Sequence, residues 1–223
     1  MSFEIPLLTL QVALLATLIN LPIALAVSWL LVKCKFRGQF IMEVLISLPL
    51  AVPPVAIGFS LLLLLGREGP VGTVFHALFG VDIVFTWFAA AVAAAVVSFP
   101  LIVRAMMVAM AEVDERFELA ARGLGAGAWR VAFTITIPLA YRGVLAGILL
   151  GFVRALSEFG ATIIVAGNIP GRTQTLPLAI YSKVQLRDDH AAMIMVGASI
   201  VLAMGTLILH NWLLQKARRN RVR

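Results

Sequence analysis

Residues 7–32, LLTLQVALLATLINLPIALAVSWLLV, form an apolar stretch that contains no charged residue. About 20 apolar residues in a helix cross the hydrocarbon core of a bilayer. Lipid offers no partner to a free backbone N–H or C=O, so such a stretch must be helical there. No basic residue precedes it and it is far longer than the apolar part of a signal peptide. We therefore expect it to be retained as a transmembrane helix.

Four further apolar stretches follow the first one along the chain. Of the 223 residues, 61% are hydrophobic and 13% are charged, with a mean hydropathy of +1.01. A soluble domain carries about one charge in four residues. The composition therefore predicts an all-α integral membrane protein with about five transmembrane helices. No shift in composition and no repeat divides the chain, which indicates one domain over residues 1–223. The four stretches are residues 41–65, 83–109, 143–167 and 192–214.

The basic residues predict the orientation in the membrane. With the N-terminus outside, 13 of the 18 basic residues fall in cytoplasmic segments, 4 fall outside and Arg154 falls within a predicted span. An excess of Lys and Arg marks the cytoplasmic side. We expect a multi-pass protein of the inner (plasma) membrane with its N-terminus outside and its C-terminus in the cytoplasm. The net charge of +7 then reflects topology, and no nucleic-acid partner is expected.

Prolines interrupt two of the predicted spans. Pro49, Pro53 and Pro54 lie near the middle of the second span, and Pro100 lies in the third. Such residues are tolerated in a membrane where neighbouring helices or water cover the freed carbonyls. One interpretation is a kink that serves helix packing. The other is that bent helices leave a cavity at the bundle axis, which makes Pro53 and Pro54 candidates for a translocation path.

Several catalytic and metal-binding patterns are absent from the sequence. It has no phosphate-binding loop of the Gly-x-x-x-x-Gly-Lys-Ser/Thr type and no Gly-x-Ser-x-Gly around a serine. His76, His190 and His210 are scattered, and Cys34 has no cysteine partner for a disulfide or metal site. The sequence therefore predicts a chain that is not an enzyme and binds no cofactor or metal.

Residues 111–138 are predicted to form a cytoplasmic loop with a short helix. Asp114 can cap this helix, and the glycines from Gly123 onward indicate its end and a tight reversal. Ala120, Ala121 and Gly125 give it a narrow, small-residue surface that could fit into a groove on another protein.

The spacing in this loop resembles the cytoplasmic motif of ABC importer permeases. In that motif Glu-Ala-Ala is followed by three residues, Gly, nine residues and Ile-x-Leu-Pro. Leu119 stands at the Glu position, with Glu118 one residue earlier, and Ile137 stands at the Leu position. The resemblance implies a type I ABC importer permease fold in which this coupling helix docks on an ATPase subunit. The residues that it assigns to coupling are Glu118, Leu119, Ala120, Ala121, Gly125 and Pro138.

Other segments resemble the molybdate permeases within this family. They are Leu-Pro-Leu-Ala-Val-Pro-Pro-Val at 48–55, Ser-Phe-Pro-Leu at 98–101, Ala-Leu-Ser-Glu-Phe-Gly-Ala-Thr at 155–162 and Gly-Asn-Ile-Pro-Gly at 167–171. Sulfate and tungstate permeases share the form of residues 158–161. The resemblance implies the transmembrane subunit of an ATP-driven oxyanion importer, for molybdate or alternatively tungstate or sulfate. The implied partners are a second copy in a homodimer, two ATPase subunits that hold ATP-Mg, an external substrate-binding protein and membrane lipid.

A self-sufficient secondary transporter is the competing hypothesis. It would need inverted repeats or several intramembrane carboxylates. The sequence has no repeat, and only Glu158 lies well inside a predicted span.

Arg154 and Glu158 are four residues apart near the centre of the fourth predicted span, with Ser157 beside them. A charge there costs at least about 2.5–3.5 kcal/mol, so a partner or water is expected. The two side chains can pair on one helix face, as a structural ion pair. Alternatively Arg154, Ser157 and Glu158 line the path, with Arg154 lowering the barrier for an anion without holding it tightly. A third possibility is that the span is misplaced and the pair lies at the membrane surface.

Overall fold

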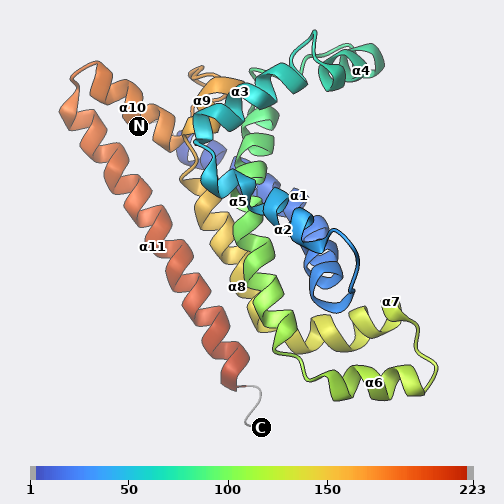
Figure 1. Ribbon diagram of the computed structural model, residues 1–223. Helices are drawn as coiled ribbons and strands as arrows, with labels where there is room; N and C mark the ends of the chain where they lie inside the picture. The colour runs from blue at the N-terminus through green and yellow to red at the C-terminus, as the bar shows by residue number, and fades with distance from the viewer. Residues whose placement is uncertain (1–3, 220–223) are drawn as a thin grey trace.

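The computed structural model describes residues 4–219, which are mainly helical and contain no strand. Arg221 and Arg223, which the charge count placed in the cytoplasm, lie outside the described residues, as do the side chains of His210, Lys216, Arg218 and Arg219. Figure 1 shows the arrangement of the helices. Their bounds are α1 Glu4–Lys33, α2 Gln39–Ala51, α3 Pro54–Leu65, α4 Pro70–Phe79, α5 Trp87–Ala111, α6 Glu115–Gly123, α7 Ala128–Val131, the π-helix η1 Ala132–Thr136, α8 Ile137–Leu156, α9 Gly160–Val165, α10 Leu176–Gln185 and α11 Asp189–Arg219.

The described chain confirms the prediction of about five spans. Four helical stretches are long and apolar enough to cross a membrane: Glu4–Lys33, Trp87–Ala111, Ala128–Leu156 and Asp189–Leu209. The pair α2 and α3 qualifies as a fifth, and it is bent by 110° at its break. Val52 and Pro53 form this break, as the proline cluster of the second predicted span suggested.

Helix α5 is the centre of the bundle, because its neighbours α1 and α8 pack closely against it (Figure 1). Its first half is a run of buried alanines, which lets other helices approach. Buried polar groups join it to α1: Asn20 donates to the carbonyl of Ala95 at 2.9 Å, and Ser28 donates to that of Val103 at 3.1 Å. These bonds satisfy the side chains and fix the register of α1 against α5.

Helices α5 and α8 pack through three glycines of α8. Gly143, Gly147 and Gly151 face Ala109, Ala105 and Ile102, and a Cβ atom at Gly143 would clash with Ala109. The two helices are antiparallel, so Ala155 lies about level with Ser98. At 1.5 Å per residue, Ser98 is about 20 Å along α5 from its end at Ala111.

The predicted fourth span, residues 143–167, needs correction. The helix begins earlier, at Ala128, and it ends at Leu156, so residues 157–159 separate α8 from α9. No proline marks this break.

The charge count placed Arg104, Arg130 and Arg142 in cytoplasmic segments, but they lie inside the long apolar helical stretches Trp87–Ala111 and Ala128–Leu156. Arg104 is in α5 and Arg142 is in α8. Arg104 lies about 10 Å along α5 from Ala111. The remaining basic residues still favour the same orientation.

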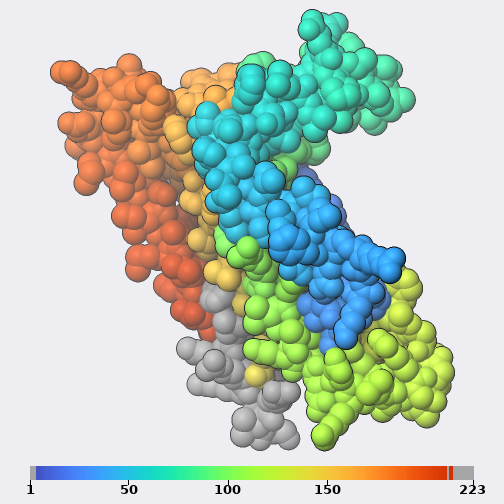
Figure 2. Space-filling model, viewed as in Figure 1, coloured from blue at the N-terminus to red at the C-terminus, as the bar shows by residue number. Residues whose placement is uncertain are grey.

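The two ends of the bundle carry different short helices. Helices α4, α9 and α10 lie at the end where α1 begins, and α6 and α7 lie at the opposite end (Figure 1). Figure 2 shows α4 projecting from the body. The sequence analysis missed this helix, although Pro70 in its first turn and the left-handed Gly80 after it are ordinary boundary signals. Helix α10 follows Thr175, and Pro177 lies in its first turn.

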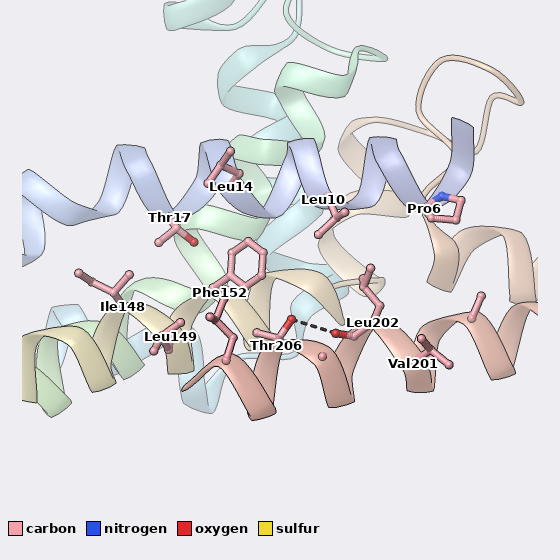
Figure 3. A pocket seen from close by; sticks show the side chains of 13 residues that line it. Pro6, Leu10, Leu14, Thr17, Ile148, Leu149, Phe152, Val201, Leu202 and Thr206 are labelled. Atoms are coloured by element: carbon pink, nitrogen blue, oxygen red, sulfur yellow. Dashed lines mark hydrogen bonds between the residues drawn. The ribbon is translucent and has the colours of Figure 1, made fainter. Parts of the chain in front are cut away.

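Helix α11 packs against α8 and α10. A cleft of about 870 Å³ lies between α11, α1 and α8, with apolar side chains such as Leu10, Phe152 and Leu202 along its walls (Figure 3). The hydroxyl groups of Thr17 and Thr206 donate to carbonyls of their own helices, at 2.8 and 2.9 Å. The walls of the cleft are therefore apolar, as on a surface that contacts lipid, and do not suit an anion.

Candidate functional site

The predicted coupling helix, α6, has the local structure that its sequence indicates. Asp114 precedes the helix and accepts a hydrogen bond from the N–H of Arg116 at 2.9 Å. Gly125 has φ +85°, a left-handed conformation that glycine adopts without strain. The N–H of Ala126 donates to the carbonyl of Ala121 at 3.0 Å and closes the turn. The predicted cap and reversal are both confirmed.

The outer surface of α6 is open and partly apolar. Leu119 is 62% exposed and Leu124 is 91% exposed. Ala120 is also exposed and Ala121 is half-buried. Among the described residues, no atom beyond the chain neighbours of Gly125 lies within 4 Å of a Cβ built on it. Exposed apolar side chains beside small residues are typical of a surface that another protein covers.

Glu118 points away from this surface, into the protein. One of its oxygens, Oε1, lies 3.1 Å from Lys33 Nζ and accepts a hydrogen bond from Thr136 Oγ1 at 2.7 Å. The Glu118 and Lys33 side chains are 6% and 7% exposed. The cluster of these three residues ties α6 to the end of α1 and to η1. Sequence reasoning had no signal for Lys33 or Thr136 as partners, because both are far from Glu118 along the chain.

Helix α7 and the π-helix η1 connect α6 to the membrane-spanning α8. Trp129 stacks on Trp29 of α1, with 5.4 Å between ring centroids. The N–H of Ile137 donates to the carbonyl of Ala132, five residues earlier, as in a π-helix. Pro138 lies in the first turn of α8, where its missing N–H is tolerated. The chain therefore remains helical from α7 through η1 into α8, with no loop between them.

The second predicted group of residues gathers where two helices are broken. Glu158 Oε2 pairs with Arg154 Nη1 at 2.8 Å, and Glu158 Oε1 accepts from the N–H of Ala161 at 2.8 Å. The Glu158 side chain is 2% exposed and that of Arg154 is 28% exposed. The pairing that the spacing predicted is therefore present. It bridges the break between α8 and α9, and Glu158 caps the first turn of α9.

The α8–α9 break lies against the α2–α3 break. A Cβ built on Gly160 would be 3.0 Å from Pro54 Cβ, and one on Gly58 would be 2.6 Å from the carbonyl oxygen of Ala161. Pro53 closes the bend and Pro54 begins α3. Ser157 lies in the other break, where its hydroxyl donates to the carbonyl of Arg154 at 3.1 Å. All five predicted path candidates therefore belong to one junction, about 20 Å from the end that carries α6.

Arg154→Ala should destabilise the junction, because it leaves the buried Glu158 carboxylate without a counter-charge. We expect a loss of about 3 kcal/mol in unfolding free energy. The double variant Arg154→Ala/Glu158→Gln should regain most of it, because Gln keeps an acceptor for Ala161. Chemical denaturation in detergent measures both. Equal stability of the single and double variants would contradict a structural ion pair.

The described residues contain no group of three or more His, Cys, Asp or Glu that could hold a metal ion.

Comparison with known proteins identifies the family. The family described as "Binding-protein-dependent transport system inner membrane component" matches residues 20–219. The chain is 45% identical over 219 residues to the molybdenum transport system permease protein ModB of Escherichia coli (strain K12), covering 97% of this chain and 95% of that protein. The Haemophilus influenzae ModB is also 45% identical, over 95% of this chain and 93% of its own. The sulfate transport system permease protein CysT of Escherichia coli (strain K12) is 34% identical over 90% of this chain and 72% of its own.

The fold has counterparts among solved structures. An inward-facing structure of the MetNI methionine ABC transporter contains a chain that matches with a TM-score of 0.76 and 14% identity, over 95% of this chain and 94% of that one. At this identity the likeness concerns the fold alone, and it agrees with the type I ABC importer permease fold. This multi-pass membrane chain therefore belongs to the family of binding-protein-dependent transport system inner membrane components.

Proposed function

We propose that this chain is the transmembrane subunit of an ATP-driven importer that carries molybdate into the cytoplasm. The observation that carries the proposal is the 45% identity to molybdenum permeases over nearly the whole chain. The lower identity to a sulfate permease, 34%, supports sulfate as the second candidate. Tungstate is a tetrahedral oxyanion of the same class and is the third.

The junction of broken helices argues against a secondary transporter. Such a protein needs an intramembrane carboxylate that is free to bind a proton or a sodium ion. Both oxygens of Glu158 are already engaged, one by Arg154 and one by the N–H of Ala161. The free energy for transport then has to come from ATP-Mg on separate ATPase subunits, and this chain is not itself the enzyme.

The proposed mechanism is alternating access in a homodimer with two ATPase subunits. ATP binding draws the two α6 helices together and opens the permease towards an external binding protein, and hydrolysis resets it. Two connections can transmit this movement. The Glu118–Lys33 pair links α6 to α1, and the continuous helix through η1 links α7 to α8. In this mechanism α6 is cytoplasmic, which puts the beginning of α1 outside.

Coupling of ATP hydrolysis to the loaded binding protein tests the proposed function. The permease is co-expressed with its ATPase and reconstituted in proteoliposomes with binding protein and molybdate, tungstate or sulfate. We expect ATPase activity to rise most with molybdate. If sulfate gives the larger rise, the substrate assignment changes to the alternative. If no ATPase associates with the permease, the importer hypothesis is wrong.

A further inference from the structure

Arg104 is a charged residue on the open face of an otherwise apolar helix. Arg104 is exposed, and its neighbours along α5 are the apolar residues Val103 and Ala105. Its Nη2 donates to Ser47 Oγ on α2 at 2.9 Å. Among the described residues, no carboxylate lies within ion-pair distance of Arg104. Arg154, by contrast, is already neutralised by Glu158.

An unpaired arginine at this depth is expected to face water. It lies about 10 Å from the end of α5, measured along the helix axis. A charge within a span almost always faces a bundle interior or a water-filled cavity, because contact with lipid is costly. The structure contains a suitable space: a cavity of about 520 Å³ between α2 and α5, whose lining includes Arg104, Ser47 and Glu43.

This cavity runs along α2 towards the junction of broken helices. Its lining extends from Phe40, in the first turn of α2, to Ala51, at the end of α2. Ala51 is two residues before Pro53, and Pro54 abuts Gly160 at the α8–α9 break. The cavity therefore extends along α2 from its first turn to within two residues of Pro53, which is one of the predicted path candidates.

We propose that Arg104, held by Ser47, contacts the transported oxyanion on the cytoplasmic half of the path. This inference rests on the proposed importer function. A planar guanidinium matches two oxygens of a tetrahedral anion at once, and the Ser47 hydroxyl can donate a further hydrogen bond.

Glu43 adds a negative charge to the same cavity, which favours release of the anion. Its carboxylate accepts a hydrogen bond from Gln39 Nε2 at 3.2 Å and lines the cavity with Arg104. A negative charge near the anion weakens its binding. A conduit needs such balance, since an ion that binds too tightly does not leave.

Cysteine substitution can test this inference because Cys34 is the only cysteine of the chain. In a Cys34→Ser background, Arg104→Cys is assembled with the ATPase and assayed for molybdate uptake. We expect uptake to fall about tenfold, the value of one charge-assisted hydrogen bond. Treatment with the cationic reagent aminoethyl methanethiosulfonate should restore at least half of the rate, whereas the anionic sulfonatoethyl reagent should not. Molybdate should slow the labelling.

The control is Arg37→Cys in the same background, since Arg37 is exposed in the turn between α1 and α2. It should transport normally with either reagent. Arg104→Lys provides a second variant if Arg104→Cys fails to assemble. It keeps the positive charge but loses the planar guanidinium that can bind two oxygens at once, so it should lower uptake several-fold.

Three outcomes would overturn the proposal: normal uptake in Arg104→Cys, a thiol that neither reagent reaches, or equal effects of the two reagents. In each of these cases, uptake by the Cys34→Ser parent shows that the importer function stands. If the parent itself moves no oxyanion, the proposed function fails and the role of Arg104 fails with it.

Discussion

Glu118→Ala should destabilise the permease by about 3–5 kcal/mol, the cost of leaving one partner of a buried ion pair uncompensated. The Lys33 side chain is 7% exposed, and its Nζ lies 3.1 Å from Oε1 of Glu118. The same change removes the acceptor of the Thr136 hydroxyl. This one substitution therefore removes the contact that joins α1, α6 and η1.

A double-mutant cycle separates the ion pair from general damage. Lys33→Met and Glu118→Gln should each destabilise the permease, because each leaves one charge of the pair uncompensated, whereas Lys33→Met/Glu118→Gln should lie close to the parent, since removing both charges of a buried pair is often nearly neutral. Chemical denaturation of the purified permease in detergent gives the four stabilities. Glu115→Ala is the matched control, because Glu115 is an exposed carboxylate on the same helix. Single variants within about 1 kcal/mol of the parent would show that the cluster does not anchor α6.

The functional consequence concerns coupling. If α6 moves with α1 through this cluster, the double variant should fold, bind the ATPase and hydrolyse ATP, yet transport less anion for each ATP. Unchanged stoichiometry would show that the Glu118–Lys33 pair is not needed for coupling, which leaves the helical connection through η1 and the stacking of Trp129 on Trp29.

The sequence predicted those features of the fold that depend on local chemistry. The Asp114 cap and the Gly125 reversal follow from residue types at helix ends. The bend in the second span follows from Pro53 and Pro54, which remove backbone donors. The spans follow from hydropathy alone.

The features that the sequence did not predict depend on contacts between distant segments. The α8–α9 break has no proline, and it persists because Glu158 caps α9 while Gly160 packs against Pro54. From the sequence alone, Glu118 cannot be distinguished from an exposed glutamate of α6. Its burial becomes apparent only in the structure, where it pairs with Lys33. The charge count placed Arg104 on the cytoplasmic side, although the residue falls inside the predicted span 83–109, because such a count gives no depth within a span.

Gly125→Trp should lower the affinity of the permease for its ATPase at least about 100-fold, equivalent to about 2.7 kcal/mol. Apart from the adjoining residues, no atom of residues 4–219 lies within 4 Å of a Cβ at this position, so the new side chain extends outward, into the space that a docked partner would fill. The backbone cost in the isolated permease is limited to about 1–2 kcal/mol, because φ is +85°. Membrane insertion and the junction near Arg154 should be unaffected. Binding of purified ATPase to the permease in nanodiscs measures the loss.

Gly125→Asn distinguishes the docking surface from the backbone conformation. Asn is among the residues that adopt positive φ most readily, and its side chain is much smaller than that of Trp. If α6 inserts into a groove, the Asn variant should keep most of the affinity while the Trp variant loses it. Loss in both variants would mean that the left-handed turn itself matters, through the position it gives to Leu124 and α7. If the Trp variant binds the ATPase as tightly as the parent, α6 is not part of the ATPase interface. The exposed side chains of Leu119 and Leu124 would then need another partner.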